Sequence, residues 1–600
     1  MFAGGDGSTL SLDFTTMSGL DSRFTFTRAS NATFINAAGL VEWAQANWMT
    51  QSNAFTTSPW SATNVTMTTD GQSPVDVAWR MTEANTPNLH RLDPSSVTCP
   101  NAQVSISVYV KQGSGTRHAY LRVSDNFSGE VSSKRLDPVN GTLLGAEQVG
   151  GSWTSANTSV VNVGNGWYRL VLTANKNAGS GVICRVGMCD SNGNLSYSGD
   201  GSSYLLFSGV QVNPGPAQPY IATTGSAYQA PRFDHDPSTL APKGLLLESS
   251  TTNLLEYSET FASLWVLTDL QRSTTESTTA PDGTTVFAIE TTSGTTARNF
   301  LRTAGVVNET AVTFSYWFKP GNVTDNETSA TNQSAGRIFG IYKTNATAGM
   351  IYSIRIDGQD PTAFQVQVGT GTYEAVAYPN GWYRCRLTTT ITTGDSIRVY
   401  LGSTGGQAVD SLYWYVWGAQ LETGSGASSY IPTGAGTVQR AADVCEFPFD
   451  PATYGYNTDP NHTFALGWNI GVGTTSGFPG LFDIRDVGGN RCHGFTINNA
   501  ANPTHFSQAG VTAGSVTTVG LTNRPIGVNR KLAASVIDGA TGHNFSIDGV
   551  AGTPQAVTSA VLRVPTRVGS PGVQIPSATL QFVKFYPFAM TSAQLNAITS

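Results

Sequence analysis

The feature that most constrains the fold of this chain is an internal repeat. Six sequence anchors occur twice in the same order, at offsets between 205 (Trp60 to Trp265) and 215 (Arg169 to Arg384). Because loops vary in length while strands keep their order, such drift is expected between two copies of one domain. The anchor pairs are Asn47 and Asn253, Trp60 and Trp265, Lys111 and Lys319, the Asn-Gly-Trp-Tyr-Arg segments ending at Arg169 and Arg384, Gly209 and Gly418, and Ile221 and Ile431.

Each copy consists of short segments with the alternation of a half-buried strand. Apolar and polar residues alternate from Val104 to Lys111, and Asn165-Gly166 forms a turn signal just before an apolar run that begins at Trp167. Many short strands separated by turns are typical of an antiparallel sandwich of two sheets. We therefore predict two jelly-roll β-sandwiches, at residues 47–222 and 253–445.

Composition supports a folded, turn-rich β protein and excludes several classes of partner. Charged residues make up 12% of the 600 residues, and Gly and Pro together number 64 + 28 = 92. The net charge is −7 and no Lys/Arg cluster occurs, so we expect no nucleic-acid partner. No apolar run approaches 18 residues, so we expect no membrane insertion. The six cysteines lack metal-binding spacing, and we expect buried free thiols.

The last 155 or so residues, 446–600, have no match to the repeat and form a third predicted β unit. Leu532 to Asp538 and Phe545 to Asp548 each run into a glycine, which indicates strands ending in Asp-Gly turns. Thr591-Ser-Ala-Gln594 has the spacing of a capping box, and it predicts a short terminal helix.

Two motifs resemble segments of tailed-phage structural proteins identified as head-spike or tail-fibre proteins. One is Phe24-Thr-Phe-Thr-Arg28 with Gly39-Leu, and the other runs from Pro231-Arg-Phe-Asp to Gly244-Leu-Leu-Leu-Glu248 and Asn253. The resemblance implies a small β hub in which the two motifs are adjacent. Here about 190 residues separate them, so we predict that the first jelly roll is inserted into the hub, which domains with close termini allow.

The resemblance also implies identities for the other domains and sets the predicted boundaries. The paired copies are similar to carbohydrate-binding-module-like jelly rolls, and the last unit is similar to concanavalin/laminin-G-like sandwiches. The predicted organisation is an all-β chain. Its parts are residues 1–46 (first half of the hub), 47–222 (jelly roll, copy 1), 223–252 (second half of the hub), 253–445 (jelly roll, copy 2) and 446–600 (concanavalin/laminin-G-like sandwich).

Residues with possible chemistry do not form a catalytic or metal-binding pattern in the sequence. Asp234-His235-Asp236 lies at a turn, and neighbouring strand residues point to opposite faces, so we expect no site there. Cys492 and His493 are sequence neighbours, whereas a nucleophile and its base usually converge from different elements. No pair of histidines has helical metal-ligand spacing. We expect no catalytic residues, no metal and no cofactor, although the many carboxylates leave a glycosidase pair open.

Aromatic side chains are the remaining candidates for ligand binding, because sugar rings stack on exposed Trp and Tyr. Alignment of the copies places Trp414 and Val416 on a core-facing side of one strand and Tyr415 and Trp417 on the other side. Trp417, which replaces Ser208 of the first copy, and Tyr415 are the candidate ligand-binding residues. The alternative, which we favour, is that this sheet face is covered.

The sequence therefore favours a non-enzymatic structural protein of a phage particle. We expect a tail-fibre, head-fibre or appendage subunit located at the particle surface. Its expected partners are other virion proteins, further copies of itself, as a trimer for example, and a host-surface glycan. One alternative is a polysaccharide depolymerase with accessory binding modules. Another is a secreted bacterial lectin or adhesin, against which the absence of a secretory signal pattern weighs.

Overall fold

The computed structural model describes most of the chain as strands in two compact units. Unit 1 comprises residues 1–42, 231–431 and 439–600, and unit 2 comprises 43–230 and 432–438. The described residues are 6–98, 103–124, 130–151, 153–176, 181–262, 264–292, 299–309, 311–322, 337–344, 349–356, 359–403, 412–455, 461–470, 480–488, 491–497, 504–510, 516–522, 528–537, 539–557, 567–570 and 577–600.

Unit 2 is a jelly roll of two antiparallel sheets around one core. The first sheet has the order β17 (Trp153–Gly164), β18 (Trp167–Lys176), β11 (Gln103–Ser114), β21 (Tyr204–Pro214), β8 (Val77–Glu83) and β7 (Val65–Gln72). The second has β15 (Thr142–Leu144), β14 (Arg135–Asp137), β12 (His118–Ser124), β19 (Gly181–Cys189), β9 (Pro87–Asp93) and β20 (Ser196–Ser198), with β6 (Ser61–Thr63), β10 (Val97–Thr98), β13 (Glu130–Ser132) and β16 (Gln148–Val149) at its margins.

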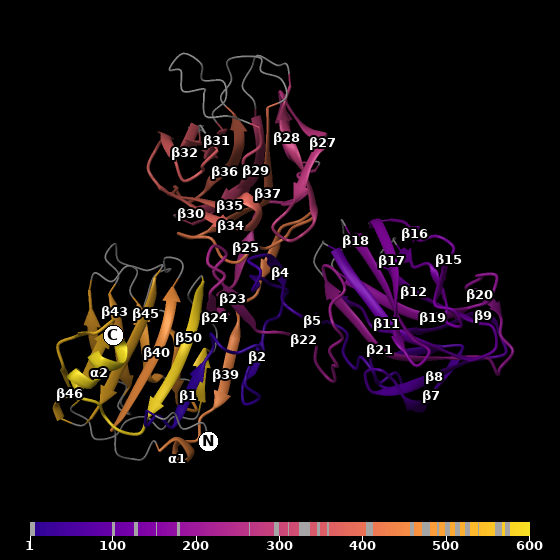
Figure 1. Cartoon of the computed structure of the whole chain (residues 1–600), viewed down its shortest axis with the longest axis horizontal. Helices are drawn as coiled ribbons and strands as arrows, with labels where there is room; N and C mark the ends of the chain where they lie inside the picture. Colours follow the sequence, from indigo (N-terminus) through magenta and orange to yellow (C-terminus); the bar gives the residue numbers. More distant parts are fainter. Residues whose placement is uncertain are drawn as a thin grey trace. The chain divides into compact units, whose positions relative to one another are not determined.

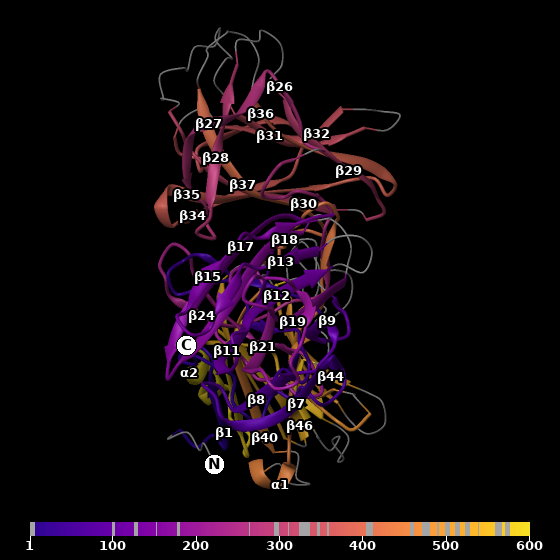
Figure 2. The same cartoon turned by 90° about the vertical axis from the view of Figure 1, so that its right-hand side faces the viewer.

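The second jelly roll, within unit 1, has the same strand order in its first sheet. Its strands are drawn at the top of Figures 1 and 2. Its first sheet runs β34 (Thr372–Tyr378), β35 (Trp382–Thr390), β30 (Ala311–Lys319), β37 (Tyr413–Thr423), β28 (Thr285–Thr291) and β27 (Leu270–Thr279). Its second runs β26 (Val266–Thr268), β29 (Asn299–Val307), β36 (Asp395–Ser403), β31 (Arg337–Lys343), β32 (Gly349–Ile356) and β33 (Phe364–Val368). The order β34-β35-β30-β37-β28-β27 matches β17-β18-β11-β21-β8-β7 strand for strand.

The repeated anchors have the same physical role in both copies. Asn47 and Asn253 each donate to two backbone carbonyls and accept from two backbone amides, which ties the entry segment to the long strand β21 or β37. The partners are Val210, Ile221, Met49 and Val212 in copy 1, and Ala419, Ile431, Leu255 and Leu421 in copy 2. Buried amide groups must find partners, so an Asn at this position is required twice.

A β-bulge also recurs at the repeated glycines. The registers of β11 with β21 and of β30 with β37 shift at Gly209 and Gly418, whose φ angles are 54° and 64°. A Cβ on Gly418 would lie 2.7 Å from the Trp317 ring, so glycine is required both for this backbone conformation and for this close packing.

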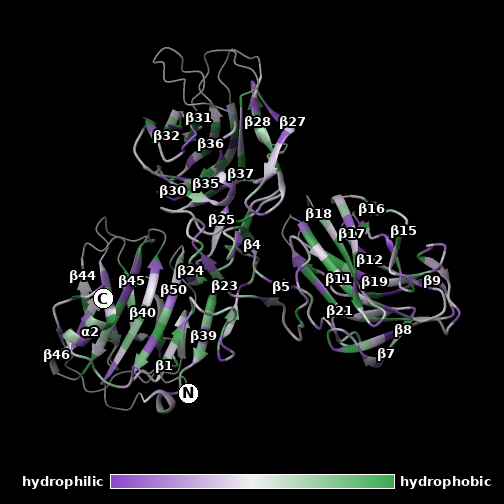
Figure 3. Ribbon diagram, in the orientation of Figure 1, coloured by the Kyte–Doolittle hydropathy of each residue, from purple (hydrophilic) through white to green (hydrophobic). Residues whose placement is uncertain are grey.

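The third sandwich, in the other part of unit 1, is built from two sheets that enclose a large apolar core. One sheet contains β23 (Arg232–His235), β24 (Pro242–Leu247), β50 (Ala578–Tyr586), β40 (His462–Ile470), β45 (Asn529–Val536), β46 (Gly539–Ile547) and β47 (Val550–Ala551), with β1 (Leu10–Asp13) and β48 (Gln555–Val557) paired alongside. The other contains β2 (Thr25–Thr27), β39 (Val444–Pro448), β49 (Arg567–Ser570), β41 (Gly480–Arg485), β42 (Arg491–Ile497), β43 (His505–Gly510) and β44 (Val516–Leu521). Hydrophobic residues alternate with hydrophilic ones along strands such as β40 and β50 (Figure 3).

The strands of the two phage-like motifs belong to this third sandwich and do not form a separate module. β24 pairs with β50, Leu245 opposite Leu580, and β2 pairs with β39, Phe26 opposite Cys445. The two motif strands therefore lie in opposite sheets and do not pair with each other. They pack on the same core, which includes Leu245 and is contacted by Phe26. Figure 1 shows β23, β24, β50 and β40 side by side.

The two ends of unit 2 meet in a short pair of strands, β5 (Ala46–Asn47) and β22 (Tyr228–Gln229). The Ala230 amide also donates to the Gln45 carbonyl at 2.8 Å. The chain therefore enters and leaves this jelly roll at one place, which is the geometry that an inserted domain requires.

Helices are short in the described part of the chain, as predicted. They are α1 (Pro451–Tyr454), α2 (Ser592–Thr599) and the single 3-10 turn Pro379–Gly381. Thr591 and Gln594 form the predicted capping box at the start of α2. The described cysteines (Cys184, Cys189, Cys385, Cys445 and Cys492) are buried and are not joined to one another by disulfides, and Cys99 lies outside the described residues.

Candidate functional site

The aromatic candidates Trp417 and Tyr415 lie on the outer face of the β37 sheet, and this face is covered. Trp417 is 2% exposed and Tyr415 is 7% exposed. They pack in an aromatic cluster with Trp317, Trp382 and Tyr430, whose ring centroid lies 4.8 Å from that of Trp417. Trp414 and Val416 face the core between the sheets, as the alignment of the copies predicts. Neither Trp417 nor Tyr415 is available as an exposed platform for sugar stacking.

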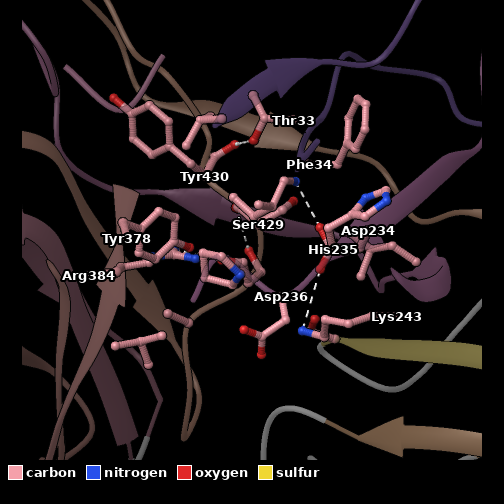
Figure 4. A pocket seen from close by; sticks show the side chains of 18 of the residues that line it. Thr33, Phe34, Asp234, His235, Asp236, Lys243, Tyr378, Arg384, Ser429 and Tyr430 are labelled. Carbon is pink, nitrogen blue, oxygen red and sulfur yellow. Dashed lines mark hydrogen bonds and ion pairs between the residues drawn. The ribbon is translucent and has the colours of Figure 1, made fainter. Parts of the chain in front are cut away.

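A cavity of about 250 Å³ lies beside this cluster, within unit 1. Its walls come from the outer face of β34, β35 and β30, from the strand β3 (Thr33–Ile35), and from β23 with the turn that follows it. Asp234, His235 and Lys243 lie on one side of it, and Tyr378 and Arg384 lie on the other (Figure 4). Segments far apart in the sequence therefore meet in one polar pocket.

The Asp234-His235-Asp236 trio, for which we expected no site, lines this pocket. Asp234 accepts from the Ile35 amide at 2.8 Å and lies 3.5 Å from the Lys243 ammonium. Burial nevertheless raises the pKa of Asp234 above its usual value. Asp236 accepts from the amides of Ser238 and Thr239, the turn-capping role predicted for it. Both carboxylates are therefore already satisfied by donors of the protein.

His235 is the one member of the trio with an unused polar atom. Its Nδ1 is buried and has no hydrogen-bond partner. The alternation of β23 places Arg232 and Asp234 in buried positions and leaves Phe233 and His235 half-buried, so the histidine does not share a face with Asp234. The three residues line one pocket without forming an acid-base pair.

The opposite wall of the pocket carries two arginines, which sequence reasoning missed. Arg384 and Arg386 lie two residues apart on β35 and so share its outer face. Arg384 is 5% exposed, donates from Nη2 to the Ser428 carbonyl at 2.8 Å, and stacks 4.6 Å from the Trp317 ring centroid. Desolvation lowers the pKa of Arg384. The one available sequence signal was that Arg386 replaces Val171 of copy 1 at a repeated strand.

A buried network of charged residues holds the hub strands behind the pocket. Arg232 donates to Glu248 at 2.6 Å and to Asp443 at 2.5 Å, and Arg28 donates to Asp443 at 3.0 Å. All of these side chains are at most 1% exposed. Burial alone would raise the pKa of Glu248, but the charges of Arg440 and Arg232 lower it to about 2. Glu248 is therefore ionised, and through Asp443 the network joins residues of both phage-like motifs.

A second buried polar network crosses the core of the third sandwich. His493 bonds to His462 at 2.8 Å and to Ser507 at 3.1 Å, and Ser507 bonds to His543 at 2.9 Å. Burial lowers the pKa of His543 to about 4, so its imidazole is neutral at neutral pH. The ring nitrogens of His493 thus bond to His462 and Ser507 across the sandwich, and neither of these bonds involves the neighbouring Cys492. The chain of bonds is suited to ordering the core.

The described residues offer neither a metal site nor a membrane-spanning helix. Within those ranges, no three His, Cys, Asp or Glu side chains are placed to hold a metal ion together. Likewise, none of the helices described is long and apolar enough to cross a membrane.

Comparisons with known proteins gave no family. No family model and no curated protein matches the chain. Among solved structures, a CBM22 tandem domain of Paenibacillus barcinonensis Xyn10C is 14% identical, with a TM-score of 0.22, over 65% of this chain and 98% of that one. The CBM40 of a Ruminococcus gnavus IT-sialidase is 14% identical, with a TM-score of 0.21, over 26% of this chain and 92% of that one. Trypanosoma rangeli sialidase is 10% identical, with a TM-score of 0.21, over 96% of this chain and 98% of that one. Such TM-scores do not establish a shared fold, so the sandwiches are assigned from their own sheets.

Proposed function

We propose that this chain is a non-catalytic structural subunit at the surface of a tailed-phage particle, a fibre or appendage that recognises a host-surface glycan. The observation that carries the proposal is the buried network of Arg28, Arg232, Glu248 and Asp443. Its first three members are residues of the two motifs that resemble phage fibre proteins. The residues that carry the resemblance thus have a physical reason to occur together.

The proposed binding site is the polar pocket between β3, β23 and the outer face of the second jelly roll. It is a concave site with hydrogen-bonding groups from several elements, which is the usual form of a small-ligand site. Its 250 Å³ is just below the roughly 300–1,000 Å³ of drug-sized sites, so it suits a single sugar unit. The second jelly roll and the third sandwich, both in unit 1, would then act as rigid supports for the site.

The test is to locate the chain and to measure its binding. Antibodies against the purified protein should label intact phage particles in electron micrographs, and the protein should bind host cells in competition with extracted surface polysaccharide. Incubation with that polysaccharide should release no reducing ends. Absence from particles would overturn the structural role, and released reducing ends would favour the depolymerase.

We also propose that the subunit assembles with copies of itself, which light scattering of the purified protein tests.

A further inference from the structure

The residues that line the pocket include buried hydrogen-bond donors without partners, whereas the carboxylates of the lining all have partners. Its carboxylates are each satisfied: Asp234 and Asp236 as described above, Glu248 by Arg232 and Ser429, and Glu374 by Arg386 at 3.0 Å. In contrast, three buried donors in the lining have no partner, namely Nε of Arg384, Nε of Arg386 and Nε1 of Trp317. A buried donor without a partner carries a free-energy cost, and these donors leave positive partial charge beside the cavity, which favours a ligand with acceptor groups.

The charge of Arg384 also favours a ligand that supplies acceptor groups. Its side chain is buried, and its contacts are a carbonyl, the Ser315 hydroxyl and the face of Trp317. Within the described ranges, none of the ion pairs involves Arg384. The carboxylates of Glu422 and Glu248 stabilise this buried cation only from a distance, so a negatively charged ligand group that paired with it directly would stabilise it further. Guanidinium groups bind carboxylates in two parallel hydrogen bonds, which gives direction as well as strength.

The first jelly roll provides an internal comparison. Arg169, the equivalent of Arg384, likewise has an unpartnered Nε and stacks on Tyr109, the equivalent of Trp317. This arginine–aromatic pair is therefore part of the repeated scaffold. The additions specific to copy 2 are Arg386 and Glu374, which face each other across β34 and β35, where copy 1 has Val171 opposite Ser159. The second cation is thus the feature that converts a structural arginine into a site.

We propose that the pocket binds the carboxylate of an acidic sugar through Arg386 and Arg384, with Glu374 as the group that the ligand carboxylate displaces from Arg386. This inference rests on the proposed glycan recognition and names its ligand class. The Glu374 side chain is 59% exposed, so it is free to turn away into solvent when the ligand enters. Lys243, on the opposite wall, adds a third cation to the pocket.

The experiment measures binding of D-glucuronate, D-glucose and inorganic phosphate to the full-length protein by calorimetry. D-Glucuronate should bind, and D-glucose should bind about tenfold or more weakly, as expected when a charge-assisted hydrogen bond is lost. Arg386→Val, which installs the copy 1 residue, should weaken glucuronate binding by a similar factor of about ten. Glu374→Gln should strengthen it, because the competing carboxylate is removed while the fold of the strand is kept.

The matched control is Arg272→Gln, which removes an exposed arginine of β27 in the same jelly roll, outside the pocket. It should leave glucuronate binding unchanged. Equal binding of glucose and glucuronate, or weaker binding by Glu374→Gln, would overturn the acidic-sugar assignment, and phosphate bound as tightly as glucuronate would overturn its sugar part. Host-cell binding that persists in Arg386→Val while glucuronate fails to bind the wild type would refute this inference alone. Failure of the wild type to bind host cells would refute the proposed function.

Discussion

At the scale of single residues, the phage-like motifs are explained by buried charge. A motif arginine such as Arg232 is costly to bury alone, and it persists because Glu248 and Asp443 are buried with it in hydrogen-bonding geometry. Such a network is weak evidence for net stability. It does determine how the strands pack, since any other packing would leave a buried charge without its partner. Sequence patterns of this kind therefore mark a junction between strands more than a binding site.

Replacing Arg232 with methionine tests this role. The substitution keeps much of the side-chain volume but leaves two buried carboxylates without their shared partner, so it should cost about 3–5 kcal/mol. The measurement is the denaturant midpoint for unfolding of the full-length protein. Arg80→Met is the control, since Arg80 pairs with Asp70 in a solvent-exposed position and its loss should leave the midpoint unchanged. An equal effect of the two substitutions would show that the network has no special role.

Glu259 gives a pH-dependent prediction. It occupies the position of Asn53 in copy 1, and burial, followed by the charge of Asp282, raises its pKa to about 8. A carboxyl group with a raised pKa binds more protons in the folded than in the unfolded chain, so its contribution to stability is present below pH 4.5 and is lost as the pH rises through 8. Glu259→Asn should therefore stabilise the protein at pH 9 relative to pH 4.5.

Thermal unfolding of wild type and variant at the two pH values gives the comparison. The relevant quantity is the difference between the two proteins, because His543, whose pKa is lowered to about 4, titrates in both. A variant that changes the unfolding temperature equally at both pH values would contradict a raised pKa for Glu259.

At the scale of elements, the strand β24 depends on a glycine where it meets β50. Gly244 has φ of 98°, and a Cβ there would lie 2.2 Å from the backbone oxygen of Leu580. Gly244→Ala should therefore separate the two strands and lower the unfolding temperature of the third sandwich. Gly394→Ala is the matched control, because Gly394 has φ of 90° and open space, so only the backbone conformation, about 1–2 kcal/mol, is penalised. Equal losses in both variants would rule out the steric contact.

The repeat, the strands and the terminal helix could be predicted from the sequence because their signals are local. The alternation near Val104 and the capping box at Thr591 each involve a few neighbouring residues. The pairing of Leu245 with Leu580 leaves no such signal, since the partners are far apart and any apolar strand would fit the pattern. The pocket was missed for the same reason: Arg386 and His235 line one cavity only when segments far apart in the sequence converge.

At the scale of the whole molecule, we expect that the chain can be separated into two independently folding parts at the paired strands β5 and β22, which close unit 2. Residues 43–230 expressed alone should fold, and residues 1–42 joined to 231–600 by a short flexible linker should fold as well. Residues 446–600 alone should not, because β1, β2, β23 and β24 would be missing from the third sandwich and β39 would be truncated. Dispersed amide NMR signals and a cooperative thermal transition are the readouts. A folded 446–600 fragment would show that the motif strands are dispensable.

The pairing of β1 with β50 sets the order in which the protein can mature during synthesis. Leu10 lies opposite Phe585, so the first strand has no partner until almost the whole chain has left the ribosome. At about 5–20 residues per second, that delay is roughly half a minute to two minutes. Both jelly rolls are complete long before then, and they can fold while the first strand waits. The third sandwich is thus the last to close, and its closure is a checkpoint for synthesis through β50: a product truncated before β50 would keep unpaired strand edges open to chaperones and proteases.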